Sequence, residues 1–368
     1  MVANRFEMPV QYDTPGSPII RMQGITKTFK TAAGEATVLK DISIDILQGQ
    51  LVSVVGRSGS GKSTLVNMIT GIDHPSSGTV EIGKLNIHKM PESAMAVWRG
   101  KNLGIVFQFF QLLPMLTLIE NVMLPMDFCN IFAPASREQR ALELLRMVGL
   151  EGLAHKLPEA VSGGEQQSVA VARALANDPP ILIADEPTGN LDTHTAKQVM
   201  QIFEELADQG KTILLVTHDR ALAARANRML LISDGELANE WLVAAFPDAA
   251  HSELVSLSKQ AVEEYLPPGE GLDRTAIQSS PVYLLVRGEL VTGKDKQVIY
   301  QKSGSLVDLL STRLELRGGD QGAELLTLPR DMVMPLLSSS NQAASAQSSQ
   351  RGKGLTLLRR LLRGWRLK

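Results

Sequence analysis

The chain has 368 residues, with 37 lysine and arginine residues against 39 aspartate and glutamate residues. This near-neutral balance argues against a chain devoted to nucleic acid, and the length allows one large domain with a full core and a second, smaller domain. The single cysteine, Cys129, excludes an internal disulfide and suits a reducing compartment, and no apolar run reaches the roughly 18 residues that a membrane-spanning helix needs.

The predicted elements begin after a polar arm at residues 1–18, which contains Pro and Gly and lacks the apolar core of a signal peptide. A large domain follows over residues 19–240, and it mixes strands and helices in an α/β order. We expect strands at 20–28, 37–46, 51–55, 79–82, 103–107, 181–186, 212–217 and 228–232, and helices at 62–70, 136–148 and 164–176.

A glycine-rich loop follows the predicted strand at 51–55. From Gly56 to Thr64 it reads Gly-Arg-Ser-Gly-Ser-Gly-Lys-Ser-Thr, which has the spacing of a phosphate-binding loop. Its glycines let backbone N–H groups approach an anion, and the following helix directs its positive end at the phosphates. We expect Lys62 to reach the β and γ phosphates and Ser63 to ligate Mg²⁺. The loop therefore predicts nucleotide binding.

Two further segments supply partners for this loop. The strand at 181–186 ends in two acids, so Asp185 can lie near Mg²⁺ while Glu186 polarises an attacking water. The segment Ser162-Gly163-Gly164 precedes a helix, and the free N–H groups at a helix N-terminus form a second anion site.

The order of these motifs resembles the ATPase subunit of ABC transporters, over about residues 19–240. The resemblance implies a P-loop NTPase with a helical subdomain, which binds ATP and Mg²⁺ and hydrolyses ATP to ADP and phosphate. It implies that Ser162 and its two glycines contact the γ phosphate of ATP held by the Lys62 loop of a second copy, in a head-to-tail homodimer. It further implies that Glu186 is the general base and that His218 holds the γ phosphate and the base in register.

The same resemblance assigns the remaining roles. Phe29 matches the aromatic residue that stacks on adenine, Gln108 the glutamine that senses Mg²⁺, and Asp192 the D-loop acid. Ser168 stands where the family usually carries Arg, which removes a charge near the nucleotide interface. The predicted catalytic residues are Glu186, His218 and Lys62; the predicted metal ligands are Ser63, Gln108 and Asp185; the predicted nucleotide contacts are Phe29, Gly56, Ser58, Gly59, Ser60, Gly61, Lys62, Ser63, Thr64, Gln108, Ser162, Gly163, Gly164 and Asp192.

The stretch from residue 107 to 126, together with residues 188–192, resembles one branch of the family, the ATPases of lipoprotein-release, macrolide-export and cell-division systems. Those systems pair an ATPase dimer with permeases whose helices transmit motion instead of carrying solute through the bilayer. The resemblance implies a permease in separate chains and a peripheral location at the cytoplasmic face of the inner membrane. Nothing in the sequence identifies the cargo.

Beyond residue 240 the chain needs its own explanation. A predicted helix at 252–264, a Pro-Pro-Gly-Glu turn at 267–270, and short strands at 282–286, 298–301 and 324–328 resemble a cyclic-nucleotide-binding β-roll over 241–338. The phosphate-binding segment of that family belongs between Ser303 and Gly322, where only Arg313 and Arg317 stand, without the preceding Gly-Glu. We therefore expect a degenerate roll that serves protein contact or dimerisation.

The last residues change character twice. Residues 339–350 are rich in Ser, Gln and Ala and have the composition of a flexible linker. Residues 351–368 place leucines and Trp365 at helical spacing, with cationic residues between them and no acid. Such a basic amphipathic helix can lie among lipid headgroups or dock on a partner, and the alternative is a solubilising tail.

Two other functions stay open at this level. A soluble ABC ATPase of the DNA-repair or translation kind usually carries a coiled-coil insert or two cassettes in one chain, and this sequence has neither. A cyclic-nucleotide-regulated ATPase would need ligand binding by residues 241–338. Recovery of a stoichiometric integral-membrane partner would favour the transport ATPase over both.

Overall fold

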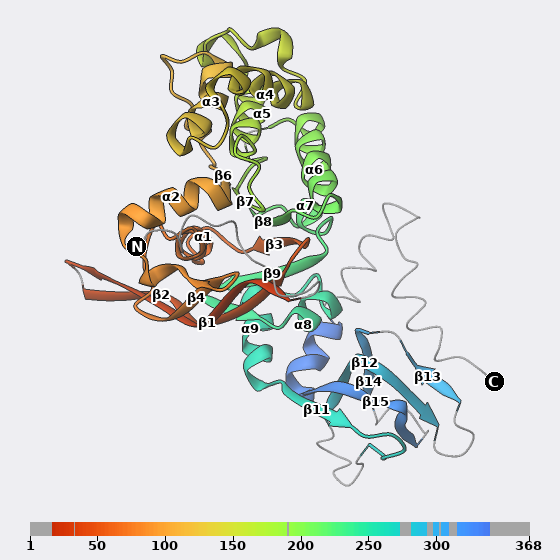
Figure 1. Ribbon diagram of the computed structural model, residues 1–368. Coiled ribbons are helices and arrows are strands. Elements are labelled where there is room, and N and C mark those ends of the chain that lie inside the picture. Colours follow the sequence, from red (N-terminus) through yellow and green to blue (C-terminus); the bar gives the residue numbers. More distant parts are fainter. Residues whose placement is uncertain are drawn as a thin grey trace. The chain divides into compact units, whose positions relative to one another are not determined.

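The computed structural model describes residues 17–32, 34–189, 191–272, 281–292, 297–301, 303–308 and 315–338. These residues belong to two compact units that divide between Leu237 and Ala238 (Figure 1). The predicted linker at 339–350, the basic segment at 351–368 and all but the last two residues of the predicted arm lie outside the described ranges. Within those ranges, no helix is long and apolar enough to cross a membrane.

The first unit mixes strands and helices along its whole length. Its elements are β1 (Pro18–Thr31), β2 (Gly34–Leu47), β3 (Leu51–Val55), α1 (Lys62–Thr70), β4 (Ser77–Ile82), β5 (Leu85–Asn86), α2 (Glu92–Asn102), β6 (Leu103–Val106), α3 (Leu118–Cys129), α4 (Pro134–Met147), α5 (Gly163–Ala174), β7 (Ile181–Asp185), α6 (Thr193–Asp208), β8 (Thr212–Thr217), α7 (Arg220–Ala223), β9 (Arg228–Ser233) and β10 (Glu236–Ala238).

The central sheet has the strand order β10-β9-β3-β8-β7-β6. The neighbouring pairs from β9 to β6 are parallel, with Val55 opposite Thr217 and Asp185 opposite Val216. Every residue of β3 and β8 is buried, as expected for strands covered on both faces, whose sequences read as continuous apolar runs. Because the strands are parallel, the loops that follow β3, β6, β7 and β8 leave from one edge of the sheet.

A second sheet, of order β2-β1-β4-β5, is antiparallel and packs its apolar face into the same core. This core joins Ile20 and Met22 of β1 to Leu65 of α1 and the fully buried Trp98 of α2. Phe29, near the end of β1, lies opposite Ala36 of β2.

A helical region formed by α3, α4 and α5 shares a second core with the other face of the central sheet (Figure 1). Capping boxes begin two of its helices: Thr117 and Glu120 cap α3, and Ser162 and Glu165 cap α5. Helices α4 and α5 match the helices predicted at 136–148 and 164–176, whereas α2, α3 and α6 were not predicted. Helix α3 contains Pro125, a residue that normally argues against a helix interior.

The second unit contains α8 (Glu240–Ala245), α9 (His251–Gln260), β11 (Val262–Leu266), β12 (Val282–Thr292), β13 (Val298–Tyr300), β14 (Ser305–Asp308), β15 (Leu316–Leu328) and helical residues 330–338. Its antiparallel sheet has the order β11-β15-β12-β13, and β14 pairs with β12.

The predicted helix at 252–264 is wrong at its C-terminal end. The helix ends at Gln260, and Val262 to Leu266 instead form β11, which pairs with β15 from Thr327 to Ala323. The main-chain hydrogen bonds between β11 and β15 replace those that a longer helix would have made. Residues 262–266 have no strong local preference, so pairing with β15 decides that they form a strand.

Candidate functional site

The predicted catalytic residues lie at one edge of the central sheet. The loop from Gly56 follows β3, Gln108 follows β6, Glu186 follows β7 and His218 follows β8. In open sheets of parallel strands, ligands bind at the carboxyl ends of the strands. Four segments that are far apart in sequence therefore meet where a nucleotide would bind.

The glycine-rich loop has the close packing that its glycines predict. A Cβ atom added at Gly56 would lie 2.4 Å from both the Ile232 carbonyl oxygen and Ser60 Oγ, so only glycine fits there. Gly61 precedes α1 with φ 106° and gives the helix no side-chain cap, and no acid occupies the first turn of α1. The first N–H groups of α1 are thus left for an external acceptor.

Two polar side chains of this loop fit a phosphate ligand. Lys62 is buried, and its Nζ donates to the carbonyl oxygens of Gly56 and Arg57 at 2.9 and 3.0 Å. Ser60 Oγ is buried without a hydrogen-bond partner among the described residues. A buried polar atom without a partner is costly, and an anion in the loop would remove that cost.

Ser63 and Asp185 form the candidate metal site. Ser63 Oγ donates to Asp185 Oδ2 at 3.1 Å, although 122 positions separate the two residues. Burial raises the pKa of the Asp185 carboxyl against the opposing effect of the Ser63 hydrogen bond, and Glu186 adds to the rise. A hydroxyl beside a partly buried carboxylate is a donor set suited to Mg²⁺. Gln108 is exposed, and within the described part of the chain no hydrogen bond joins its side chain to Ser63 or Asp185.

Glu186 and His218 form a direct pair. His218 Nδ1 lies 2.7 Å from Glu186 Oε2, and the Glu186 side chain is mostly buried while His218 is exposed. The Glu186 backbone has φ 50°, an uncommon value for a residue with a side chain, and its N–H donates to the Val216 carbonyl oxygen at 2.9 Å. The hydrogen bond to β8 therefore holds the Glu186 backbone in a conformation that an unconstrained residue rarely adopts, and this conformation sets the direction of the carboxylate.

Ser162 caps α5, Gly163 and Gly164 are its first residues, and the described residues nearest to the two glycines are Phe110, Leu191 and Thr195. Glu165 Oε2 accepts hydrogen bonds from Ser162 N and Ser162 Oγ, both at 2.7 Å. These bonds, from the side chain first and the backbone second, lower the pKa of Glu165. The Ser-x-x-Glu spacing is a readable capping signal, but the sequence analysis did not use it.

The segment after Gln108 is attached to α5 through a residue that the sequence analysis missed. Arg173 donates to the carbonyl oxygens of Phe110 and Gln111 at 2.7 and 2.6 Å, and both of those residues have positive φ. Burial lowers the pKa of Arg173. The guanidinium thus fixes an unusual backbone conformation between the glutamine loop and the helix that starts at Ser162.

Three other predicted residues have local roles. Asp192 accepts from Thr195 N at 3.1 Å and from Thr195 Oγ1 at 2.6 Å in the first turn of α6. Ser168 Oγ donates back to the Gly164 carbonyl oxygen at 3.1 Å, within α5. Phe29 has 38% of its surface exposed, and the Lys27 ammonium lies 4.8 Å from its ring centroid.

In the described part of the second unit, the arginine at the position where a cyclic-nucleotide-binding roll would bind phosphate is already paired. Arg317 donates to Glu315 Oε1 at 2.7 Å and to the Gly269 carbonyl oxygen at 3.2 Å, so its charge is already paired. Arg313 lies outside the described residues. A separate groove of about 660 Å³ is lined by Gln260, Val262, Pro281, Thr327, Leu328, Pro329, Arg330, Asp331 and Met334.

Comparisons with known proteins agree with the geometry of the first unit. A family model described as ABC transporter matches residues 39–189. The chain is 44% identical over 220 residues to the lipoprotein-releasing system ATP-binding protein LolD of Bacteroides thetaiotaomicron, covering 60% of this chain and 99% of that protein. It is 39% identical over 254 residues to the macrolide export ATP-binding/permease protein MacB of Pectobacterium atrosepticum, covering 67% of this chain and 39% of that longer protein.

A solved structure is similar over the same region. It is the dimeric structure of a post-hydrolysis state of the ATP-binding cassette MJ0796, from Methanocaldococcus jannaschii, bound to ADP and phosphate. The TM-score is 0.57 at 40% identity, and the match covers 60% of this chain and 97% of that one.

Proposed function

Because the chain belongs to the ABC transporter family of ATP-binding proteins and is an ATPase of that family, we propose that two copies close head to tail around two ATP molecules and drive a separate membrane permease. The observation that carries this proposal is the Glu186–His218 pair, 2.7 Å apart at the sheet edge where the phosphate loop also begins. A mostly buried carboxylate held by an exposed histidine is an arrangement for activating water, which simple nucleotide binding does not need.

The chemistry of the site is positioning and charge neutralisation. Lys62 and the N-terminus of α1 hold the phosphates, and Ser60 Oγ gains a partner. Ser63, Asp185 and Gln108 would hold Mg²⁺, which would neutralise part of the phosphate charge. Glu186 accepts a proton from the attacking water, and His218 keeps Glu186 oriented toward the phosphate.

The proposal of a dimer is based on the position of the second anion site, at the start of α5. Ser162 begins α5, which belongs to the helical region, whereas Lys62 begins α1 beside the central sheet. Among the described residues, no hydrogen bond joins Ser162 or the two glycines after it to the phosphate loop of their own chain, so we assign them to the ATP held by the partner. The dimeric state of the MJ0796 cassette supports this assignment.

Coupling to a permease is supported by exposed apolar side chains beside the proposed Mg²⁺ sensor. Phe109 and Met115 expose 71% and 78% of their surfaces just after Gln108, and Leu113 lies between them in sequence. Exposed apolar side chains that follow one another so closely in sequence suit a docked partner. The LolD and MacB relatives favour a permease of the mechanotransmission type, with the chain peripheral at the cytoplasmic face of the membrane.

The second unit is proposed to serve protein contact or dimerisation. The pairing of Arg317 with Glu315 supports this over cyclic-nucleotide sensing, because a phosphate would have to displace that carboxylate. Saturable binding of cyclic AMP or cyclic GMP to the full chain, lost on Arg317→Ala, would contradict the proposal. Contact of residues 351–368 with lipid headgroups stays a prediction from sequence.

We expect the full chain, purified from membranes of its own organism in mild detergent, to bring down a stoichiometric integral-membrane protein. A variant with Phe109 and Met115 changed to Ser should lose that partner and keep basal ATPase activity, while Phe128→Ser, another exposed aromatic change, serves as the matched control. Retention of a nucleic acid in place of a membrane protein would support the soluble alternative.

Glu165→Gln is expected to strengthen ATP-driven dimerisation, because it removes a negative charge from the anion site at the start of α5. An amide can still accept the hydrogen bonds of Ser162. A charge at a helix N-terminus contributes about 0.3–1 kcal/mol, and the dimer contains two such sites, so the dimer dissociation constant should fall roughly three- to thirtyfold. Analytical ultracentrifugation would measure it, with Glu120→Gln, in the matching capping box of α3, as control. Weaker dimerisation would refute the charge argument.

A further inference from the structure

Lys27 connects the proposed base-binding ring to the helix that begins at the phosphate loop. The two side chains of Lys27 and Phe29 are two residues apart on β1, so they project to the same face of the strand. The Lys27 ammonium lies 4.8 Å from the Phe29 ring centroid, within the range of a cation–π interaction. One face of the ring is therefore covered by a cation from the same strand.

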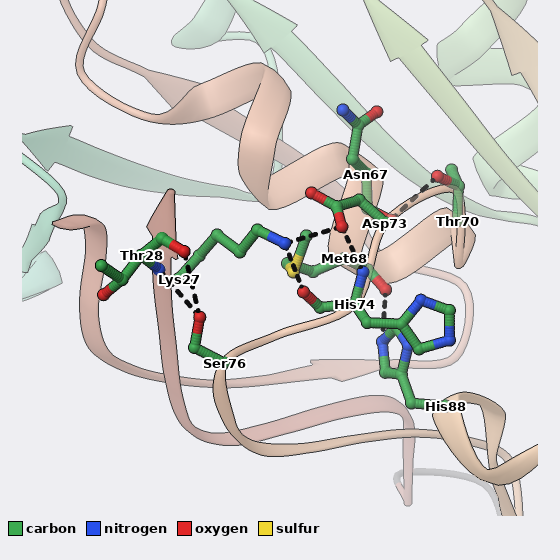
Figure 2. A network of polar contacts seen from close by, with 9 residues as sticks. All are labelled: Lys27, Thr28, Asn67, Met68, Thr70, Asp73, His74, Ser76 and His88. Carbon is green, nitrogen blue, oxygen red and sulfur yellow. Dashed lines mark hydrogen bonds and ion pairs between the residues drawn. The ribbon is translucent and has the colours of Figure 1, made fainter. Parts of the chain in front are cut away.

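The position of Lys27 is fixed by hydrogen bonds. Its Nζ donates to Asp73 Oδ1 at 2.6 Å and to the His74 carbonyl oxygen at 2.7 Å, and Figure 2 shows the side chain extended toward both. Only 12% of the Lys27 side chain is exposed. Burial would raise the pKa of Asp73, but the Lys27 hydrogen bond and the His74 N–H bring it below its ordinary value. The pair is thus a charged contact held in one geometry.

The acceptors of Lys27 are in turn attached to α1. The N–H groups of Ile72 and Asp73 donate to the Asn67 carbonyl oxygen at 3.1 and 3.2 Å, which closes the C-terminal turn of α1. His88 Nε2 lies 2.9 Å from the Met68 carbonyl oxygen, and its ring lies 4.9 Å from that of His74 (Figure 2). The loop that receives Lys27 is therefore continuous with the last turn of α1.

A second set of contacts joins the same loop to β1. Ser76 Oγ accepts from Thr28 N at 2.9 Å and donates to the Thr28 carbonyl oxygen at 3.3 Å (Figure 2). In addition, Ser76 N donates to the Thr26 carbonyl oxygen at 2.8 Å. The strand segment that carries Phe29 is thus bound to the C-terminal end of α1, while the N-terminal end of α1 faces the phosphates.

We propose that Lys27 is a positioning residue for the purine base of ATP. This inference depends on the nucleotide site proposed above. Lys27 covers one face of the Phe29 ring and leaves the other face for the base. Through Asp73, it also couples the ring to the helix that holds the phosphates. The competing explanation is an ion pair that only stabilises the loop. That explanation predicts no difference between ligands with and without a base.

The test compares two ligands of the full chain, ATP and inorganic tripolyphosphate, each with Mg²⁺, by calorimetric titration. Without the Lys27 cation, the Phe29 ring should lose the position in which it stacks on the base. Because stacking contributes to the affinity for ATP, Lys27→Met should weaken ATP binding about five- to thirtyfold. Tripolyphosphate binding should change less than about twofold, because the phosphate contacts remain. Lys30→Met is the matched control, since Lys30 lies on the same strand with 88% of its side chain exposed, and it should change neither affinity.

A double-mutant cycle separates ring positioning from general loosening of the loop. In a chain that already carries Phe29→Ala, Lys27→Met should have little further effect on ATP affinity. In a chain with Phe29 unchanged, Lys27→Arg should keep most of the ATP affinity that Lys27→Met loses. Equal losses for ATP and tripolyphosphate, no loss for ATP, or additive effects of the two substitutions would each overturn the proposal. If the unsubstituted chain binds tripolyphosphate but shows no preference for ATP, the base site fails while the phosphate loop stands; if it binds neither, the proposed function itself fails.

Discussion

Glu186→Gln is expected to bind ATP with nearly unchanged affinity while its turnover falls by about 10²–10⁴-fold, the contribution typical of a positioned general base. The amide can occupy the same space and contact His218, but it cannot accept a proton from water. Steady-state phosphate release and equilibrium binding of ATP, measured on the same preparation, check the two halves of the expectation.

The matched control for this change is Glu138→Gln, which alters an exposed glutamate on α4 in the same way. It should leave turnover unchanged. A variant at Glu186 that hydrolyses ATP at the normal rate would remove this residue from the role of base. Loss of ATP binding together with turnover would show instead that the carboxylate maintains the loop after β7.

Mixed dimers are expected to recover activity that neither parent dimer has. Lys62→Ala removes the phosphate contact of one copy, and Ser162→Arg blocks the anion site at the start of α5. In a head-to-tail dimer with one copy of each variant, one composite site keeps Lys62 and Ser162 and the other loses both. With random pairing, half of the dimers are mixed and half of their sites are intact, so the activity should reach about one quarter of the unsubstituted value.

Two differently tagged copies, co-expressed and purified over both tags, would isolate the mixed dimer and raise the expected value to about one half. The two single-variant homodimers, purified in the same way, are the controls. A mixed dimer no more active than its parents would contradict shared sites, and full activity in the Ser162→Arg homodimer would show that Ser162 does not contact the nucleotide.

Much of the site could be predicted because its motifs are local. The phosphate loop combines an apolar strand with glycines at fixed spacing, and the structure shows why Gly56 is required: any side chain would meet the Ile232 carbonyl oxygen. The proximity of Ser63 and Asp185 also follows from sequence, since Ser63 ends the phosphate loop that follows one predicted strand and Asp185 lies at the end of another.

Other features depend on contacts that sequence does not display. Lys27 meets Asp73 across 46 positions, and nothing in either neighbourhood identifies its partner. Arg173 reads as an ordinary helix residue, yet it donates to two carbonyl oxygens of the loop after Gln108. Its role follows from backbone oxygens, which every sequence carries, so no side-chain pattern could have indicated it.

The boundary between α9 and β11 could not be predicted for a related reason. Residues 262–264 can continue a helical pattern, and only the presence of β15 as a neighbouring strand makes the extended state better. Helix α3 was not predicted because its interior Pro125 argues against a helix, although the capping box at Thr117 marks the start of one.

The central claim is that two copies of this chain close around ATP. It is tested most directly by measuring the mass of Glu186→Gln by light scattering after size exclusion, with and without MgATP, beside the double variant Lys62→Ala/Glu186→Gln. We expect MgATP to increase the dimer fraction of Glu186→Gln, and we expect no such increase in the double variant that lacks Lys62. A chain that stays monomeric at saturating MgATP, or an increase with MgATP that persists without Lys62, would contradict the claim.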